Sequence, residues 1–408
     1  MVHELVEKTN LCVKCGLCLP HCPTYNKTQN ENESPRGRIA LIQACANKDL
    51  ASSDKLQAHI DNCLLCRSCE KVCPAQVPYG QIIDDFRNTI QSTKKSSLDF
   101  TLLKSIVHYK KLRHAAKSLL KNYQASTLQK TVRFLKLPKI FKLDKIERLV
   151  SDKPSANQLF ELENYYPAKS DLKGDVALFS GCMGSLLDLE TLYSAISVLN
   201  YAGFNVHIPD DQTCCGALDL HNGDKETASQ LEDINQLAFA NKQWTAIISI
   251  ASGCGGHLQA YKNTGFAEKT SDISQFLIDQ GITFKPLAAL NSTVLLHTPC
   301  SLKNIMNQEL GAFELLKQIP GIKIKNISDT IKCCGSAGSY MLQHSEMAGL
   351  LVDDLINDVL SYKEKMDYLV TSNIGCALHI SARLTERKIE LGVIHPVTLI
   401  ARQLSLYN

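Results

Sequence analysis

Eight cysteines near the N-terminus fall into two runs that share one spacing, C-x2-C-x2-C-x3-C-P. The first run is Cys12, Cys15, Cys18 and Cys22, followed by Pro23, and the second is Cys63, Cys66, Cys69 and Cys73, followed by Pro74. Runs of this kind supply the thiolates of [4Fe–4S] clusters. Zinc knuckles are the alternative, but zinc sites usually combine two separated cysteine pairs, or cysteines with histidines. The spacing therefore indicates two cubane clusters and electron transfer.

The same spacing predicts which thiolates share a cluster. Three thiolates spaced by two residues can wrap one face of a cube, and the following turn carries the fourth to the neighbouring cluster. We expect one cluster on Cys12, Cys15, Cys18 and Cys73, and the other on Cys63, Cys66, Cys69 and Cys22. Short helices are predicted at Arg36–Asn47 and Ser53–Ile60, the latter capped by Ser52 or Ser53.

A second cysteine pattern is duplicated in the C-terminal half. Its first copy is Cys182, Cys214, Cys215 and Cys254, and its second is Cys300, Cys333, Cys334 and Cys376. Equivalent positions are 118, 119 and 122 residues apart, which is too constant for chance. A glycine follows each cysteine pair, and each last cysteine continues as C-x-x-H, to His257 or His379.

Buried strands are predicted just before four of these cysteines. The apolar runs are Asp175–Ser180, Ala246–Ala251, Thr293–His297 and Tyr368–Ser372. Helical segments such as Leu186–Tyr201 and Glu346–Leu360 complete the α/β units, and Ser274–Asp279 and Pro396–Leu404 end the two copies alike. Because ligands gather at the carboxyl ends of strands in open α/β sheets, the cysteines of each copy should converge on one site.

The chemistry of these duplicated sites stays open at this level. Four thiolates and an imidazole can hold an iron–sulfur cluster, a zinc ion or a redox-active disulfide, and thiolate clusters suit soft metals better than a packing role. The equivalence of His257 and His379 makes both candidate metal ligands. His297 precedes Cys300 and has no histidine counterpart near Cys182, so we interpret it as structural.

The segment 93–170 is a basic helical linker without a chemical motif. Thr101–Val150 holds thirteen Lys or Arg against two acids, a local charge of +11. Apolar residues recur there at helical spacing, at Leu102, Leu103, Ile106, Val107, Leu112, Ala115, Leu119 and Leu120. A solvated linker, an amphipathic helix on an anionic membrane face and a docking face for an acidic partner all fit. No nucleic-acid recognition module accompanies the charge, so no nucleic-acid partner is expected.

Cysteine usage also bears on the compartment. The chain has 408 residues, 17 cysteines and a net charge of only +3. Met1–Cys12 lacks the apolar core of a signal peptide, and no apolar run approaches the ~18–20 residues of a membrane span. We therefore expect a cytoplasmic protein whose clustered thiols bind metal, because disulfides are rare in reducing compartments.

The order of these motifs resembles the iron–sulfur subunits of flavin-linked 2-hydroxyacid and glycerol-3-phosphate dehydrogenases, and is most similar to those of glycolate oxidase, or glycolate dehydrogenase. The stretches that carry the resemblance are Ser34–Ile39 (SPRGRI), Cys333–Ser339 (CCGSAGS) and Asn373–His379 (NIGCALH). The expected α/β architecture is a mainly helical double-cluster ferredoxin domain at 1–92, the basic linker at 93–170, and Cys-Cys-Gly repeats at 171–290 and 291–408.

The resemblance implies a division of labour. FAD would sit on a partner flavoprotein that takes two electrons from glycolate and gives glyoxylate. This chain would pass them singly to a quinone or another membrane acceptor, from the inner face of the cell membrane, without touching the hydroxyacid. It carries no Gly-rich dinucleotide fingerprint. The nearest alternatives are the equivalent subunit of a glycerol-3-phosphate or lactate dehydrogenase, and, in another class, a zinc-stabilised adaptor without a redox role.

The repeats are also similar to those of heterodisulfide reductase, which hold non-cubane clusters at sites ending in C-x-x-C. Both sites here end in C-x-x-H instead, which disfavours the non-cubane assignment.

Overall fold

The N-terminal region is helical, as the sequence predicts. The computed structural model describes residues 2–90, 98–125, 128–135, 137–140, 143–150, 161–285, 288–328 and 333–406. The first ninety residues form α1 (Val2–Asn10), η1 (Leu19–His21), α2 (Pro23–Thr28), η2 (Glu31–Glu33), α3 (Pro35–Ala46), α4 (Asp54–Asp61), α5 (Ser68–Lys71) and α6 (Tyr79–Ile90). Between the two predicted caps of α4, Ser53 is the one used: its Oγ accepts from the N–H of Leu56 at 3.3 Å.

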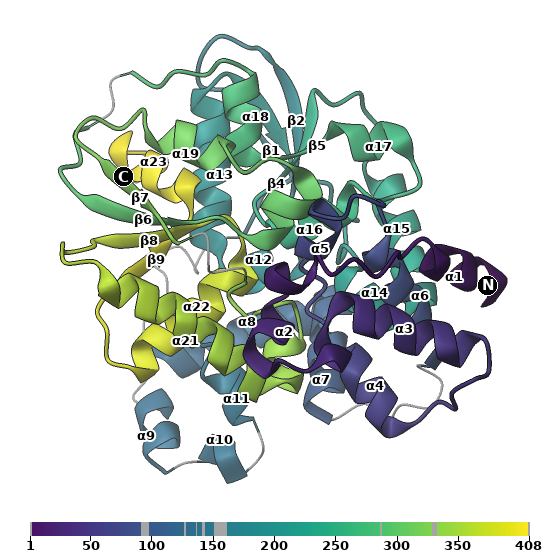
Figure 1. Ribbon diagram of the computed structural model, residues 1–408. Coiled ribbons are helices and arrows are strands. Elements are labelled where there is room, and N and C mark those ends of the chain that lie inside the picture. Colours follow the sequence, from purple (N-terminus) through teal and green to yellow (C-terminus); the bar gives the residue numbers. More distant parts are fainter. Residues whose placement is uncertain are drawn as a thin grey trace.

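The C-terminal half contains two sheets, one in each repeat (Figure 1). The first has the order β1 (Tyr165–Tyr166), β3 (Phe204–His207), β2 (Gly174–Phe179), β4 (Ala246–Ser249) and β5 (Thr270–Asp272). The second has the order β7 (Lys323–Asn326), β6 (Thr293–His297), β8 (Tyr368–Thr371) and β9 (Gly392–Ile394). Neighbouring strands run parallel except β1, which is antiparallel to β3. The predicted α/β class with four buried strands is confirmed.

Helices cover both sheets and follow most strands. In the first repeat they are α12 (Cys182–Leu187), α13 (Leu189–Tyr201), α14 (Ala217–His221), α15 (Lys225–Ala238), α16 (Ser252–Leu258), α17 (Thr264–Lys269) and α18 (Ile273–Asp279). In the second they are the π-helical η5 (Leu302–Met306), α19 (Gly311–Leu316), α20 (Tyr340–Gln343), α21 (Ser345–Ser361), α22 (Ile374–Glu386) and α23 (Pro396–Gln403).

One helix expectation was wrong in detail. The predicted helix Leu186–Tyr201 is two helices, α12 and α13, that meet at Asp188. The Asp188 side chain accepts from the N–H of Thr191 at 3.3 Å and caps α13, so the break follows from a local capping bond. As a result Cys182 lies in the first turn of a separate short helix beside the strand end.

The two repeats share one hydrophobic core. α18, which ends the first repeat, packs on α19 of the second, and α23, which ends the second, packs on α13 of the first. Val176 and Leu192 of the first repeat belong to the same buried cluster as Val294 and Leu399 of the second. Each repeat therefore completes its core with the last helix of the other.

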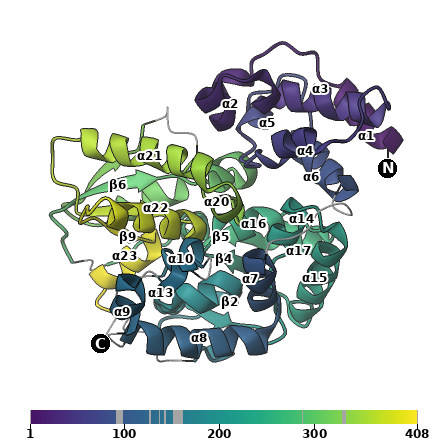
Figure 2. The same cartoon turned by 90° about the horizontal axis from the view of Figure 1, so that it is seen from below.

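The basic linker is helical and lies against the repeats. Its described helices are α7 (Leu98–His108), α8 (Lys110–Ala125), α9 (Leu128–Phe134), α10 (Leu137–Ile140) and α11 (Asp144–Glu147). α7 and α8 both contact α12. Figure 2 shows the purple and blue helices α1–α6 on one side of the repeats and α8 and α9 on the opposite side. Across the described ranges, no helix combines the length and apolar character that crossing a membrane requires.

Part of the linker's positive charge is neutralised within the chain. Lys104 pairs with Asp219 at 3.0 Å and also with Asp224. Lys110 pairs with Asp210 at 2.9 Å, and Arg148 approaches Glu386 at 3.5 Å. These contacts favour a docked segment over a solvated linker for this part of residues 93–170.

Because the two repeats share one core, a destabilising substitution in one repeat should also destabilise the other. Leu399→Ala in α23 should lower the free energy of unfolding by about 2–5 kcal/mol, because the side chain is buried in the common core. Trp244, the single tryptophan, lies in the first repeat and reports unfolding there by fluorescence. The exposed Leu360→Ala is the control, with an expected change within about 0.5 kcal/mol. An unchanged Trp244 transition in Leu399→Ala would show that the repeats unfold independently.

Candidate iron–sulfur and thiol sites

The first cavity of the N-terminal region gathers cysteines from both runs. It is lined by Cys12, Cys15 and Cys18 from the loop after α1, and by Cys73 from the loop after α5. The loop turns through Lys14 and Gly16, which have φ of 55° and 88°. Arg36 closes it, because its Nη1 donates to the carbonyl of Lys14 at 3.1 Å. The four thiols that the spacing grouped are thus brought to one cavity.

A second cavity gathers the remaining four thiols of the two runs. Cys22, Cys63, Cys66 and Cys69 line it, and all four are buried. Cys69 lines both cavities, so the two sites are neighbours. Burial raises the pKa of the Cys66 and Cys69 thiols, so keeping them ionised requires compensating positive charge. Four convergent sulfur donors in each cavity fit a [4Fe–4S] cluster.

Arg38 is the buried cation of the second cavity. Its side chain is 1% exposed, and Nη2 donates to Glu33 at 2.5 Å while Nε donates to the carbonyl of His59 at 2.7 Å. Burial alone would lower the pKa of Arg38, but nearby Tyr79, Cys63, Cys22 and Glu33 hold it above its ordinary value. The sequence marked Arg38 only as part of SPRGRI. Its role in balancing thiolate charge depends on the tertiary contacts.

The cysteines of each Cys-Cys-Gly repeat form a chain of contacting thiols. In the first repeat Cys182 contacts Cys214 with their Sγ atoms 3.7 Å apart, Cys214 contacts Cys215, and Cys215 contacts Cys254. The second repeat has the same order, from Cys300 through Cys333 and Cys334 to Cys376, with the last two Sγ atoms 2.8 Å apart. In each repeat the four cysteines therefore come together at one site, as the sequence predicts.

The glycine after each pair has a geometric reason. Gly216 and Gly335 have φ of 87° and 81°, a conformation that favours glycine. A Cβ on Gly335 would lie 2.6 Å from the carbonyl oxygen of Ala348, and one on Gly216 would lie 3.1 Å from that of Ala228. Each loop can therefore bring its two thiols close to the strand ends only because a glycine follows the cysteine pair.

All eight repeat cysteines line one common cavity of about 400 Å³. The sequence predicted a site in each repeat, and the tertiary structure opens both sites onto the same space. Linker residues form part of the apolar wall, among them Leu103, Ile106 and Leu149. Cys63 lines this cavity as well as the second cluster cavity, so the two sites adjoin.

The second cluster cavity contacts the second repeat directly. Asn304 of η5 donates to the carbonyl of Cys66 at 2.8 Å and to Ser68 Oγ at 3.0 Å. After burial, the charge of Cys300 is the next cause that raises the pKa of Cys66. The hydroxyl of Tyr340 donates to Asn62 Oδ1 at 2.6 Å, one residue before Cys63. These contacts hold the cluster loop and the second thiol chain side by side.

Among the described residues, neither C-x-x-H histidine belongs to a group of three potential metal ligands close enough to share an ion. Nδ1 of His379 lies 3.0 Å from the carbonyl oxygen of Cys334, and burial lowers its pKa to about 4. His257 packs its ring on Tyr261 and His221, with centroids 5.6 and 6.3 Å away. Both imidazoles therefore support the backbone and packing around the thiols.

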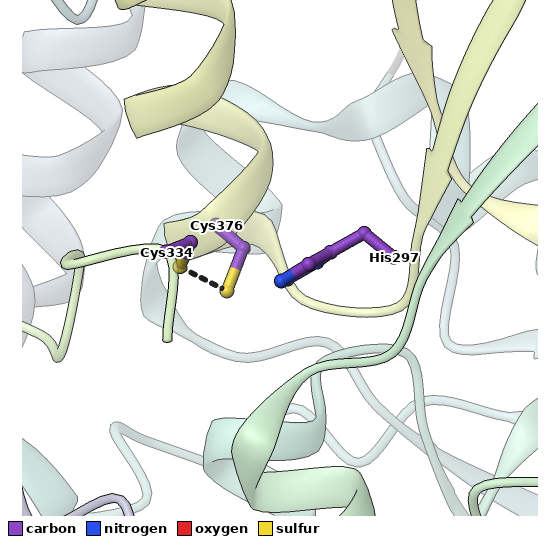
Figure 3. A group of neighbouring side chains, drawn as sticks. All are labelled: His297, Cys334 and Cys376. Carbon is purple, nitrogen blue, oxygen red and sulfur yellow. Dashed lines mark hydrogen bonds between the residues drawn. The ribbon is translucent and has the colours of Figure 1, made fainter. Parts of the chain in front are cut away.

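His297, interpreted from the sequence as structural, is the histidine beside the thiols. Its ring reaches from the end of β6 toward Cys334 and Cys376 (Figure 3), and the three possible ligand atoms lie within 4.8 Å of one another. Burial lowers the pKa of His297 to about 4, so its ring is neutral at pH 7. The H-x-x-C spacing between His297 and Cys300 could have marked His297 as a candidate ligand. The first repeat has no histidine at the equivalent position, so the duplication did not point to it.

Comparison with known proteins agrees with this arrangement. The 4Fe-4S dicluster domain family matches residues 8–77, and the cysteine-rich domain family, CCG, matches 176–259 and 294–381. The probable glycolate oxidase iron-sulfur subunit of Bacillus subtilis (strain 168) is 32% identical over 409 residues, covering 95% of this chain and 91% of the relative. The glycolate oxidase iron-sulfur subunit of Escherichia coli (strain K12) is 30% identical, covering 91% and 89%. Lactate utilization protein A of Macrococcus caseolyticus (strain JCSC5402) is 23% identical, covering 56% and 96%.

Arg38 should be needed for the second cavity to stay folded. Arg38→Met leaves the buried Glu33 without its guanidinium partner, and we expect a loss of about 3–5 kcal/mol in the free energy of unfolding. Arg402→Met is the matched control, because its pair with Glu190 is partly exposed, lies outside both cluster cavities and should contribute at most about 1 kcal/mol. Denaturant midpoints and iron per chain measure both variants. Equal losses would contradict a special role for the buried pair.

Proposed function

This chain belongs to the family of glycolate oxidase and lactate utilization iron–sulfur subunits, and from that membership we propose that it is the electron-transfer subunit of a flavin-dependent glycolate dehydrogenase. A partner flavoprotein with FAD oxidises glycolate to glyoxylate, and this chain carries the electrons toward a membrane quinone or another membrane acceptor. The observation that supports the proposal is the continuity of the sites: Cys69 lines both cluster cavities, and Cys63 lines the second cluster cavity and the common thiol cavity.

Two separate sets of cysteines hold the two [4Fe–4S] clusters, which supply one-electron steps when bound. In this proposal Cys12, Cys15, Cys18 and Cys73 hold the outer cluster, and Cys22, Cys63, Cys66 and Cys69 hold the inner one. Arg36 borders the first cavity and Arg38 the second. Each arginine offsets part of the negative charge of the thiolates, which favours uptake of an electron.

The duplicated sites are proposed to bind metal through their thiolates, either as a further iron–sulfur cluster or as zinc. The ligands are Cys182, Cys214, Cys215 and Cys254 in one repeat, and Cys300, Cys333, Cys334 and Cys376 in the other. The sequence also offered His257 and His379 as ligands. We now propose that both are positioning residues, because Nδ1 of His379 faces the Cys334 carbonyl and His257 packs on aromatic rings.

The outer face of the linker is the proposed contact with the membrane. Tyr109, Leu112, Leu119 and Phe134 are exposed on or beside α8 and α9, and Phe134 is 85% exposed. The basic residues Lys111 and Lys130 are also exposed on these helices. Apolar side chains next to lysines suit the surface of an anionic bilayer, which would place the chain on the inner face of the cell membrane.

Reconstitution tests the proposed activity. The tagged chain is isolated anaerobically from its own host with bound flavoprotein, and the complex is offered glycolate, lactate or glycerol 3-phosphate with quinone in vesicles. Glycolate should give the fastest quinone reduction, faster on anionic than on neutral lipid. Preference for lactate would instead support the alternative suggested by the lactate utilization relatives. A colourless, zinc-only preparation without a flavoprotein would overturn the electron-transfer proposal.

The crossed ligand sets predict which cluster each fourth cysteine serves. Cys22→Ser should perturb the cluster of Cys63, Cys66 and Cys69, and Cys73→Ser should perturb the cluster of Cys12, Cys15 and Cys18. EPR of the reduced chain distinguishes the two signals, and Cys45→Ser, outside both cavities, should leave both unchanged. The opposite pattern, with each cluster damaged by the cysteine of its own run, would refute the crossed assignment.

A further inference from the structure

The two Cys-Cys-Gly sites differ at one buried strand position beside the thiols. In the first sheet Phe179 of β2 lies opposite Ser249 of β4, and in the second sheet His297 of β6 lies opposite Thr371 of β8. His297 follows Phe179 by 118 residues, the same offset that relates Cys300 to Cys182. The cysteine sets are otherwise equivalent, so only the second repeat places an imidazole where the first has a phenyl ring.

The imidazole is held with its ring toward the thiols. Nδ1 of His297 lies 2.9 Å from Thr371 Oγ1, which engages that nitrogen and leaves Nε2 for another partner. Figure 3 shows the ring directed at Cys376 and Cys334. His297, Cys334 and Cys376 are each at most 5% exposed, so no bulk water competes for the site. Proteins usually orient a metal-binding histidine through a hydrogen bond at its far nitrogen, most often with a carboxylate, a backbone carbonyl or water, and here the Thr371 hydroxyl takes that position.

We propose that the second Cys-Cys-Gly site is a mixed nitrogen–sulfur metal site, with His297 Nε2, Cys334 Sγ and Cys376 Sγ as ligands, whereas the first site is all thiolate. The ion is a first-row metal of borderline softness, zinc or iron, because imidazole and thiolate together suit that class. Cys333 contacts Cys334 and supplies a further thiolate. The inference deepens the proposed function, on which it rests for the metal content of the repeats.

The geometry fits such an ion. Around a tetrahedral zinc, with Zn–S near 2.3 Å and Zn–N near 2.0 Å, ligand atoms are separated by roughly 3.4–3.8 Å. The three atoms here lie within 4.8 Å of one another, with the two sulfurs 2.8 Å apart. An ion would be centred among them once side-chain rotation moves the two sulfurs apart by about 1 Å. Within the described residues, His297, Cys334 and Cys376 form the single group of three potential ligands that lie close enough to share an ion.

In the second site His297 takes the place of Cys300 among the four ligands named above, and exchanging a thiolate for a neutral imidazole removes one negative charge from the site. Histidine ligands raise the reduction potential of iron–sulfur centres for this reason. If the ion is iron, the second site therefore accepts an electron more readily than the first. It is also the site beside Cys66, through Asn304 and Cys300. An iron centre there would draw electrons from the inner cluster in preference to the first repeat.

The decisive experiment uses the full chain, purified anaerobically with 15N-labelled histidine. X-ray absorption at the zinc edge should show imidazole scattering from a nitrogen–sulfur site in the unaltered protein, and if the metal is iron, pulsed EPR should show hyperfine coupling to the labelled histidine nitrogen in place of that scattering. His297→Phe, which copies the first repeat, should remove that scattering and lower the metal content by about one zinc or iron ion per chain. His207→Phe, at a histidine on β3 whose Nε2 pairs with Asp175 at 2.7 Å, is the control and should keep both.

A metal that stays in His297→Phe, together with absence of imidazole scattering in the unaltered protein, would overturn the inference. The spectrum of the unaltered protein decides the question even if the variant fails to fold. Glycolate turnover is a separate readout: imidazole ligation without glycolate oxidation would leave this inference standing and refute the proposed function. Glycolate oxidation by a protein whose metals are all sulfur-bound would do the reverse.

Discussion

A buried thiolate cannot keep its charge without a cation beside it, and this constraint applies to the ten cysteines that are buried in this fold. In the repeats, the pKa of Cys182 is raised by its hydrogen bond to Cys214 and then by burial, and Cys300 is affected in the same way by Cys333. Protonated thiols packed at such short distances gain little from one another. The same groups become strong ligands once a metal supplies the positive charge. Arg38 adds a permanent cation where the inner cluster cavity is most enclosed.

The backbone around the thiols is shaped to meet this demand. Left-handed turns at Gly216 and Gly335 bring each cysteine pair to the ends of parallel strands, where a side chain would collide with the neighbouring helix. The sheets themselves depend on each other, because α23 covers α13 and α18 covers α19. The shared core therefore holds the two repeats together, and this brings the four thiols of each repeat to one common cavity.

The two repeats share the same cysteine motif but contact different parts of the N-terminal region. Asn304 of the second repeat donates to the inner cluster loop, at the carbonyl of Cys66 and at Ser68 Oγ. The first repeat instead meets α6, where Arg87 donates to the carbonyl of His221 at 2.9 Å. The linker completes the assembly, because Lys104 and His108 bind Asp219 on the helix that follows the first cysteine pair. Symmetry in the duplicated motif is thus broken by what packs against each copy.

The sequence by itself determined which cysteines belong together and where most of the local structure lies. Cysteine spacing defined both quartets and the duplicated sets, strand positions followed from short apolar runs, and the α/β class followed from their alternation with helices, because all of these depend on neighbouring residues. Only the tertiary structure decided which histidine stands beside the thiols. His379 shares the sequence spacing of His257, yet its Nδ1 faces a carbonyl, while His297 reaches the thiols through a strand register that pairs it with Thr371. It also decided that Lys104 binds carboxylates 115 and 120 residues away and that both repeats open onto one cavity. Contacts between residues so distant in the chain leave no periodic trace in the sequence.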